Sequence, residues 1–219
     1  MNSSLLSLLV LAGIAIFLIL RLRSVLGTRE GFEKPASVKT SGRSEPKRDF
    51  DVIEGGPDRD ITDHVEDGSD AAKALAAMKS AEPSFSVSEF LGGARGAYEM
   101  ILMAFENGDV EKLKPFLSEE VMETFEGVIQ DRQDQGLTIE ASFVGIRELE
   151  LADASFDSST SEGEISVRLV AELTSVVRDA EGEIVEGDPN AIKRQRDLWT
   201  FARQMGASDP NWVLVATGE

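Results

Sequence analysis

Hydrophobic and polar positions change their spacing along the chain, and the changes divide it into three parts. The first part, Leu5–Leu20, is an apolar run without a charged residue. No period is then sustained until about Pro83, where a helical repeat begins and later gives way to the two-residue repeat of strands. The pattern predicts a hydrophobic helix, a linker and one folded domain, which span residues 1–26, 27–83 and 84–219.

The folded part begins with helical patterns. Ser86-Val-Ser-Glu89 is a capping box, and Asn107-Gly108 is a stop signal, so we predict a long helix between them. A short helical turn over Val110–Leu113 follows, and Ser118 then caps a second long helix that ends near Gly136. Three glycines in the first turns of the long helix are interpreted as admitting the backbone of a neighbouring element: Gly92, Gly93 and Gly96.

After Gly136 the pattern alternates and predicts four strands. The first carries a break in parity near Gly145, which indicates a bulge. The strands are expected over Ile139–Leu151, Ile165–Arg178, Ile192–Arg203 and Trp212–Thr217. Helices followed by a run of strands predict an α+β domain, with the helices packed on one face of a bent antiparallel sheet.

A bent sheet wrapped on helices leaves an apolar hollow, which is the natural place for a ligand or a partner. Five aromatic residues are candidates for lining it, and ordinary core packing is the competing interpretation of each. These residues are Tyr98, Phe125, Trp199, Phe201 and Trp212.

The apolar run is interpreted as an uncleaved membrane anchor. No basic residue precedes it, the first positive charges are Arg21 and Arg23, and no small-residue cleavage site follows. Spanning a bilayer takes roughly 20 apolar residues, and the side chains that follow Leu20 extend the run. Because basic residues mark the cytoplasmic end of a span, the rest of the chain should face the cytoplasm. A cleaved signal peptide on a secreted protein is the alternative.

Charge is distributed unevenly along the 219 residues, whose formal net charge is −18. Residues 1–48 hold 8 basic and 3 acidic groups, which leaves 14 of the 22 basic and 37 of the 40 acidic groups for the remainder. The acidic remainder disfavours nucleic acid as a partner. The basic arm could contact anionic lipid or serve only as a topology signal. Its members are Arg21, Arg23, Arg29, Lys34, Lys39, Arg43, Lys47 and Arg48.

The linker has the composition of a disordered segment, because it is rich in glycine, proline, serine and charge. Asp58, Asp60 and Asp63 lack the glycine turn and the distal glutamate of a calcium loop, and His64 has no ligand at metal-binding spacing. Asp70 is placed to cap a short alanine-rich helix over residues 71–79 within this linker.

Candidate catalytic chemistry is sparse. The chain has no cysteine, and its single histidine lies in the linker, so the domain lacks the side chain most often used in acid–base catalysis. Glu140, Glu172 and Asp197 fall on polar faces or at strand ends of the predicted sheet. An enzyme is therefore the least favoured class, and no cofactor or metal is predicted.

The folded part resembles the Tim44-like domain family over residues 85–219. The resemblance rests on FLGGARGAYEMILMAFENGDVEKLKPFLSEEVMETF, on the spacing of Trp199, Phe201 and Arg203, and on the terminal Asp209-Pro-Asn-Trp212 strand. It implies a cone-shaped fold similar to nuclear transport factor 2 and a place at an energy-transducing membrane near protein translocation. The N-terminal anchor resembles that of short bacterial members, which implies the bacterial inner membrane.

Two functions follow as hypotheses. The first is a membrane-anchored, non-enzymatic binding module in inner-membrane protein translocation, assembly or quality control, whose partners are the membrane and proteins of that machinery. The second is a carrier or sensor of a lipid-like small molecule held in the cone-shaped pocket. The second requires the aromatic residues to line an open cavity rather than to fill the core.

Overall fold

A computed structural model describes residues 58–218. The helices are α2 (Arg59–Thr62), α3 (Asp70–Ala81), α4 (Val87–Glu106), α5 (Val110–Leu113) and α6 (Glu119–Asp134). The strands are β1 (Thr138–Asp157), β2 (Glu162–Arg178), β3 (Ile184–Gly187), β4 (Lys193–Gln204) and β5 (Val213–Gly218).

The predicted anchor, the basic arm and most of the predicted linker lie outside the described residues. Within residues 58–218, no helix combines the length and the hydrophobicity that crossing a bilayer requires.

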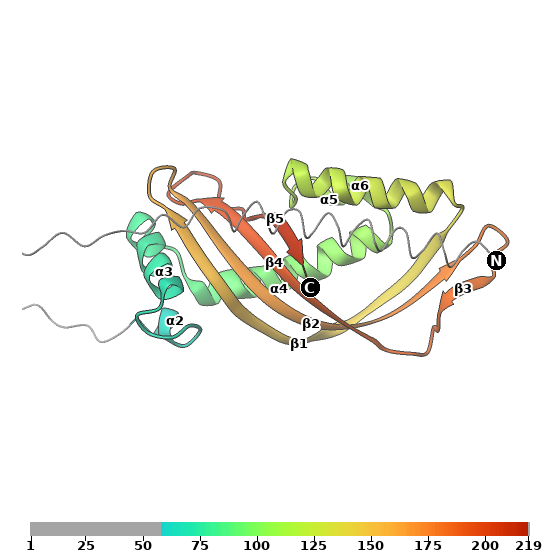
Figure 1. Cartoon of the computed structure of the whole chain (residues 1–219), viewed down its shortest axis with the longest axis horizontal. Helices are drawn as coiled ribbons and strands as arrows, with labels where there is room; N and C mark the ends of the chain where they lie inside the picture. The colour runs from blue at the N-terminus through green and yellow to red at the C-terminus, as the bar shows by residue number, and fades with distance from the viewer. Residues whose placement is uncertain (1–57, 219) are drawn as a thin grey trace, which may run out of the picture. The chain divides into compact units, whose positions relative to one another are not determined.

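The strands form one five-stranded antiparallel sheet in the order β1-β2-β4-β5, and β3 pairs with β2 beyond the end of β4. The long strands bend around α4, which lies along their concave side (Figure 1). The predicted α+β domain, with helices packed on an antiparallel sheet, is confirmed. Strand β3 was not predicted, and residues 188–192 separate it from β4.

The bend follows from irregularities in β1. The register of the β1–β2 ladder shifts between Phe143 and Gly145, and again twice further along the strand. The bulge predicted near Gly145 is therefore confirmed. Each bulge adds local twist and kinks the strand, so a 20-residue strand can curve around a helix.

Helix α4 is positioned by its caps and by its apolar face. The Ser86 hydroxyl accepts a hydrogen bond from the Glu89 N–H at 3.3 Å, as the capping box predicts, and Asn107 ends the helix. One face of α4 is buried against the sheet through Phe90, Ala94, Tyr98, Ile101 and Leu102. Because this face of α4 packs on the sheet, the orientation of the helix is set, and with it the residues of α4 that can line a binding site.

The segment before the predicted domain boundary differs from the prediction. Helices α2 and α3 bury Ile61, Leu75 and Met78, which are 5%, 0% and 0% exposed and belong to the same core as the sheet. The cap of α3 is also Ser69 rather than Asp70, since the Ser69 hydroxyl accepts from the Ala72 N–H. Packing of the domain therefore begins near residue 58, well inside the range predicted to be linker.

Asp60 fastens this segment to the start of α4. Its carboxylate accepts hydrogen bonds from the Val87 N–H at 2.8 Å and the Ser88 N–H at 2.9 Å, and Lys79 lies 2.8 Å from it. Burial opposes the charge, but the hydrogen bonds from Lys79, Ser88 and Val87 outweigh it and hold the pKa of Asp60 well below its usual range. His64 lies alongside, with its Nε2 3.3 Å from the Ser88 hydroxyl, so this histidine has a partner that the sequence did not indicate.

Candidate functional site

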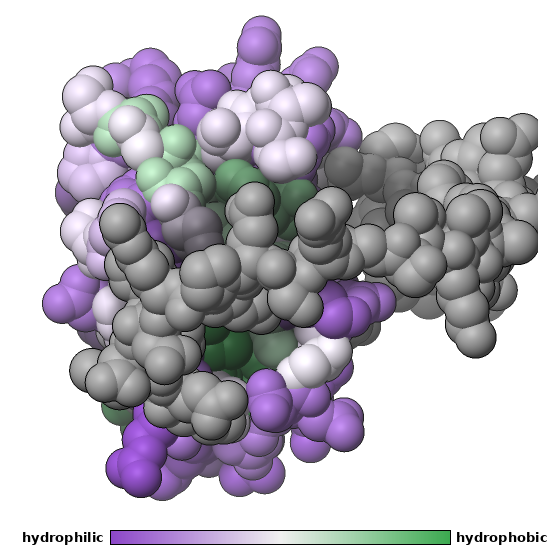
Figure 2. All heavy atoms as spheres, turned by 90° about the vertical axis from the view of Figure 1, so that its left-hand side faces the viewer, coloured by the Kyte–Doolittle hydropathy of each residue, from purple (hydrophilic) through white to green (hydrophobic). Residues whose placement is uncertain are grey.

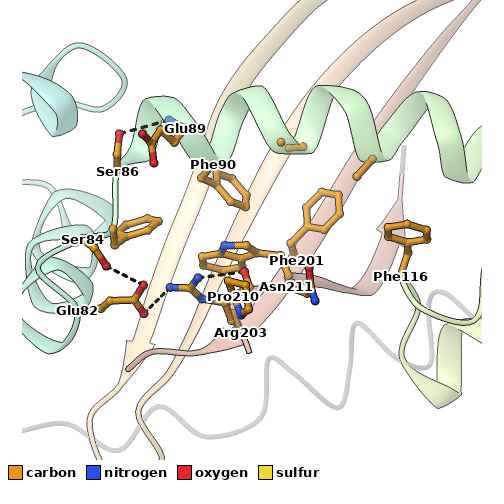
Figure 3. A pocket seen from close by; sticks show the side chains of 15 residues that line it. Glu82, Ser84, Ser86, Glu89, Phe90, Phe116, Phe201, Arg203, Pro210 and Asn211 are labelled. Carbon is orange, nitrogen blue, oxygen red and sulfur yellow. Dashed lines mark hydrogen bonds and ion pairs between the residues drawn. The ribbon is translucent and has the colours of Figure 1, made fainter. Parts of the chain in front are cut away.

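A groove with a volume of about 530 Å³ lies between the first half of α4 and the β4–β5 edge of the sheet. Its third wall is the connection between α3 and α4 (Figure 3). The floor is apolar and buried except for the half-buried Trp212, whereas rim residues such as Glu89 and Asn211 are exposed. The lining residues that the argument uses are Glu82, Phe85, Phe90, Phe201, Arg203 and Trp212.

Trp212 is the central aromatic residue of this groove, which we call the Trp212 groove. Its ring centroid lies 4.7 Å from that of Phe90, in an edge-to-face arrangement, and 5.9 Å from that of Phe85. Phe90 in turn contacts Phe201 with a centroid separation of 6.0 Å. Such contacts hold aromatic rings in fixed orientations, so the apolar floor is formed before any partner arrives.

Arg203 provides the polar wall of the groove. Its guanidinium pairs with Glu82, donates to the Pro210 carbonyl at 3.1 Å, and lies 5.2 Å from the centre of the Trp212 ring. The side chain is only 9% exposed, and within the described residues its Nε–H has no hydrogen-bond partner. The hydrogen bond from the Gly206 N–H, with that from Arg203, holds the pKa of the Glu82 carboxyl below its usual range despite partial burial.

The five predicted aromatic candidates divide between groove and core. Phe201 and Trp212 line the groove. Tyr98 and Trp199 are 0% and 4% exposed and stack on each other in the core at 4.6 Å. Phe125 lies on α6 and packs against Phe105 of α4. The structure therefore brings together two of the five in this site.

Tyr98 has a polar role inside the core. Its hydroxyl donates to Asp197 at 2.5 Å, and Gln195 donates to the same carboxylate. Burial and the adjacent Asp197 charge raise the pKa of Tyr98, so the hydroxyl stays protonated as a donor. Asp197 thus contacts α4 through Tyr98. The sequence pattern instead places it among residues on polar faces or at strand ends.

Tyr98→Phe should lower the free energy of unfolding by about 1.5–3 kcal/mol, the usual value for a hydrogen bond to a charged group. Urea unfolding of the variant measures the loss. In the double variant Tyr98→Phe/Asp197→Asn the two effects should not add, because the two residues share one interaction. Additive losses would show that the hydrogen bond does not stabilise the fold.

The predicted role of the three glycines in the first turns of α4 is wrong. A side chain at Gly92, Gly93 or Gly96 would meet nothing within 4 Å, so none of them admits a neighbouring backbone. Gly93 instead lines the Trp212 groove, whereas Gly92 and Gly96 do not. The missing side chain at Gly93 leaves room in the groove. A large side chain placed at this position would fill that room and block the groove.

The other acidic candidates form ion pairs. Glu172 is 6% exposed and lies between Arg147 and Arg194, at 2.7 and 3.1 Å. Glu140 pairs with Arg178. Among residues 58–218, no cluster of three or more candidate ligands could hold a metal ion. Neither Glu172 nor Glu140 lines the Trp212 groove.

The groove residues that the sequence did not single out as a site include Phe85, Phe90, Phe116 and Arg203. The sequence carries a signal for the first two, because Phe85 and Phe90 flank the capping box at the two positions of a hydrophobic staple. Figure 2 shows the end of the domain that carries α2 and α3. Hydrophobic side chains gather toward the middle of this view, and hydrophilic ones surround them.

Comparison with known proteins identifies the family. The sequence profile of the Tim44-like domain matches residues 71–219, which include α3, α4 and the whole sheet. The chain belongs to the Tim44-like domain family. The resemblance inferred from the sequence is thereby confirmed. Helix α2 and Asp60 lie before the matched residues.

Two curated relatives of this Tim44-like domain are mitochondrial import inner membrane translocase subunits. TIM44-1 of Arabidopsis thaliana is 26% identical over 133 residues, and TIM44 of Homo sapiens is 25% identical over 168 residues. The matches cover 61% and 72% of this chain but 28% and 36% of those proteins. The chain thus spans about a third of the length of these relatives.

Among solved structures, the Tim44-like domain matches the intermembrane space region of the chloroplast protein ARC6. The match has 13% identity and a TM-score of 0.39, and it covers 60% of this chain and 92% of that one. A TM-score this low carries no argument about function.

Proposed function

We propose that this protein is a membrane-anchored, non-enzymatic binding module of inner-membrane protein translocation, assembly or quality control. In this proposal the Trp212 groove receives an apolar segment of a partner protein. The single observation that carries it is the preformed apolar floor of Phe85, Phe90, Phe201 and Trp212, open at a polar rim. A rigid aromatic floor with few polar groups suits an apolar side chain or a short apolar segment.

Family membership supports the proposed role in protein translocation, assembly or quality control. The curated relatives are named as subunits of an inner-membrane import translocase. Location at the bacterial inner membrane rests on the resemblance of the N-terminal segment to that of short bacterial family members. The cytoplasmic orientation of the domain rests on the basic residues that follow the apolar run at residues 5–20. A tether of this kind raises the local concentration of the domain at the membrane, so weak contacts in the groove suffice.

A non-enzymatic role agrees with the chemistry of the groove. Its charged pair, Arg203 and Glu82, is engaged in hydrogen bonds that hold the wall together. Tim44-like domains are generally non-catalytic. The cone-shaped fold similar to nuclear transport factor 2 stays a prediction, and so does the contact of the basic arm with anionic lipid.

Gly93→Leu tests the groove directly. A Cβ at position 93 would meet nothing within 4 Å, and leucine also favours the helix over glycine, so the fold should be kept. Gly92→Leu is the matched control, because it adds the same side chain one residue away and outside the lining. A photo-reactive amino acid at Asn211, on the rim, reports what occupies the groove in full-length protein in its native membrane.

We expect cross-links from position 211 to proteins of the translocation or assembly machinery, or to newly made membrane proteins. Gly93→Leu should reduce them at least about tenfold, which corresponds to 1.4 kcal/mol of lost binding, and Gly92→Leu should leave them unchanged. Equal cross-linking in both variants would exclude the groove as the binding site.

A carrier or sensor of a lipid-like molecule is the second candidate, and one observation favours it. The buried Nε–H of Arg203, without a partner within residues 58–218, could donate to the oxygen of a headgroup whose chain occupies the apolar floor. Lipid adducts at position 211 without a consistent protein partner, lost in Gly93→Leu, would support this function over the first.

A further inference from the structure

The connection between β2 and β4, residues 179–192, forms an arm at the end of the sheet opposite α2 and α3 (Figure 1). We call it the β3 arm, because β3 lies in it. Strand β3 pairs with the end of β2, and all four of its residues are exposed. The arm was not among the candidate sites found from the sequence, and it lies away from the Trp212 groove.

The arm is held in shape by its own hydrogen bonds. The Asp179 carboxylate accepts from the Glu181 and Glu183 N–H groups at 3.1 and 2.9 Å, and Arg178 donates to the Gly182 carbonyl at 2.9 Å. Gly187 has φ +88°, and a Cβ there would lie 2.2 Å from the Ser175 carbonyl oxygen, so only glycine fits. A preformed arm loses little conformational entropy when it binds.

The surface of the arm combines aliphatic and acidic side chains. Ile184, Val185 and Ile192 are 43%, 54% and 59% exposed, and they are three of the six large hydrophobic side chains that are exposed within residues 58–218. Four exposed acidic residues surround them: Glu181, Glu183, Glu186 and Asp188. Exposed aliphatic groups of this kind at a strand mark an interaction surface.

The outer edge of β3 has no strand paired to it within the described residues. An unpaired edge is a template for a further strand. A second copy of this chain would bring Glu183 and Glu186 against like charges, which opposes self-pairing. A segment that carries lysine or arginine between aliphatic residues would instead match both the charges and the apolar groups.

We propose that the β3 arm binds an extended segment of another protein as an added strand on β3. The segment carries pairs of aliphatic side chains between basic ones, because Glu183 to Glu186 place one acidic and one aliphatic side chain on each face of the strand. Main-chain hydrogen bonds along the edge would provide affinity, and the acidic side chains would select a basic partner. The β3 arm is separate from the Trp212 groove. An experiment can therefore exclude binding at one of the two sites without excluding binding at the other.

The experiment uses full-length protein in a neutral detergent and a fluorescent eight-residue peptide that repeats Val-Val-Lys-Lys, so that each face of the added strand carries both valine and lysine. In companion peptides glutamate replaces lysine, or glycine replaces valine. We expect the valine–lysine peptide to bind, measured by fluorescence anisotropy, and to protect the amides of residues 184–187 from hydrogen exchange. Gly93→Leu should leave this binding unchanged.

Glu183→Lys/Glu186→Lys should weaken the peptide at least about tenfold. Glu123→Lys/Glu126→Lys on α6 makes the same change in net charge on exposed residues and should have less than about a twofold effect. Equal weakening by both pairs, equal binding of the glycine–lysine peptide, or no binding at all would overturn the proposal. Protection of residues 184–187 by self-association in the absence of peptide would also overturn it.

Discussion

A chain that starts at residue 84, where the sequence placed the domain boundary, should fail to fold stably, whereas a chain that starts at residue 58 should fold. The shorter chain lacks Ile61, Leu75 and Met78, which are nearly or fully buried against the sheet. Truncating one large core side chain costs about 2–5 kcal/mol, and whole domains are stable by only about 5–15 kcal/mol. Losing all three together should remove most of the net stability.

Urea unfolding of residues 84–219 and 58–219, followed by circular dichroism and by tryptophan fluorescence, measures this difference. A chain that starts at residue 69 is the informative intermediate, because it keeps α3 and its Ser69 cap but loses α2 and Asp60. We expect it to fold with reduced stability, since loss of a helix cap costs about 1–2 kcal/mol. Equal unfolding midpoints for all three chains would show that residues 58–83 act as a linker.

The sequence revealed the elements whose determinants are local. The capping box at Ser86, the alternation of β2 and the parity break at Gly145 each lie within one element, so a pattern of a few residues predicts them. Helix α2 has only four residues. It is positioned by Asp60, whose hydrogen-bond partners at the start of α4 lie 26 to 28 residues away. No local period can indicate such a contact.

The site was only partly predictable for a related reason. Helical spacing shows that Tyr98 and Phe90 are both apolar positions of α4, but not which of them faces the open edge of the sheet. That distinction depends on β5, on the Asp209–Asn211 turn and on the connection at Glu82, which meet α4 only in three dimensions. Arg203 was noticed as part of a family spacing, yet its pairing with Glu82 joins residues 121 positions apart.

Arg203→Met should lower the free energy of unfolding by about 3–5 kcal/mol at neutral pH, as expected when one partner of a largely buried ion pair is removed. Methionine keeps much of the apolar bulk, but it leaves the Glu82 carboxylate, 20% exposed, with the Gly206 N–H and Ser84 as remaining donors. It also removes the cation over Trp212. Arg203→Lys retains the charge and should cost less.

The pH dependence of the stability lost in Arg203→Met distinguishes a contribution of the Glu82–Arg203 ion pair from a contribution of side-chain packing. Because the pKa of Glu82 is lowered in the folded protein, the stability it contributes is present above its unfolded pKa of about 4.3 and declines as the pH falls below that value. The difference in unfolding free energy between wild type and Arg203→Met should therefore narrow between pH 5 and pH 3. The double variant Glu82→Gln/Arg203→Met should be more stable at neutral pH than Arg203→Met, since no unpaired carboxylate remains. A constant difference across this pH range, with additive losses, would mean that Arg203 holds the groove wall by packing alone.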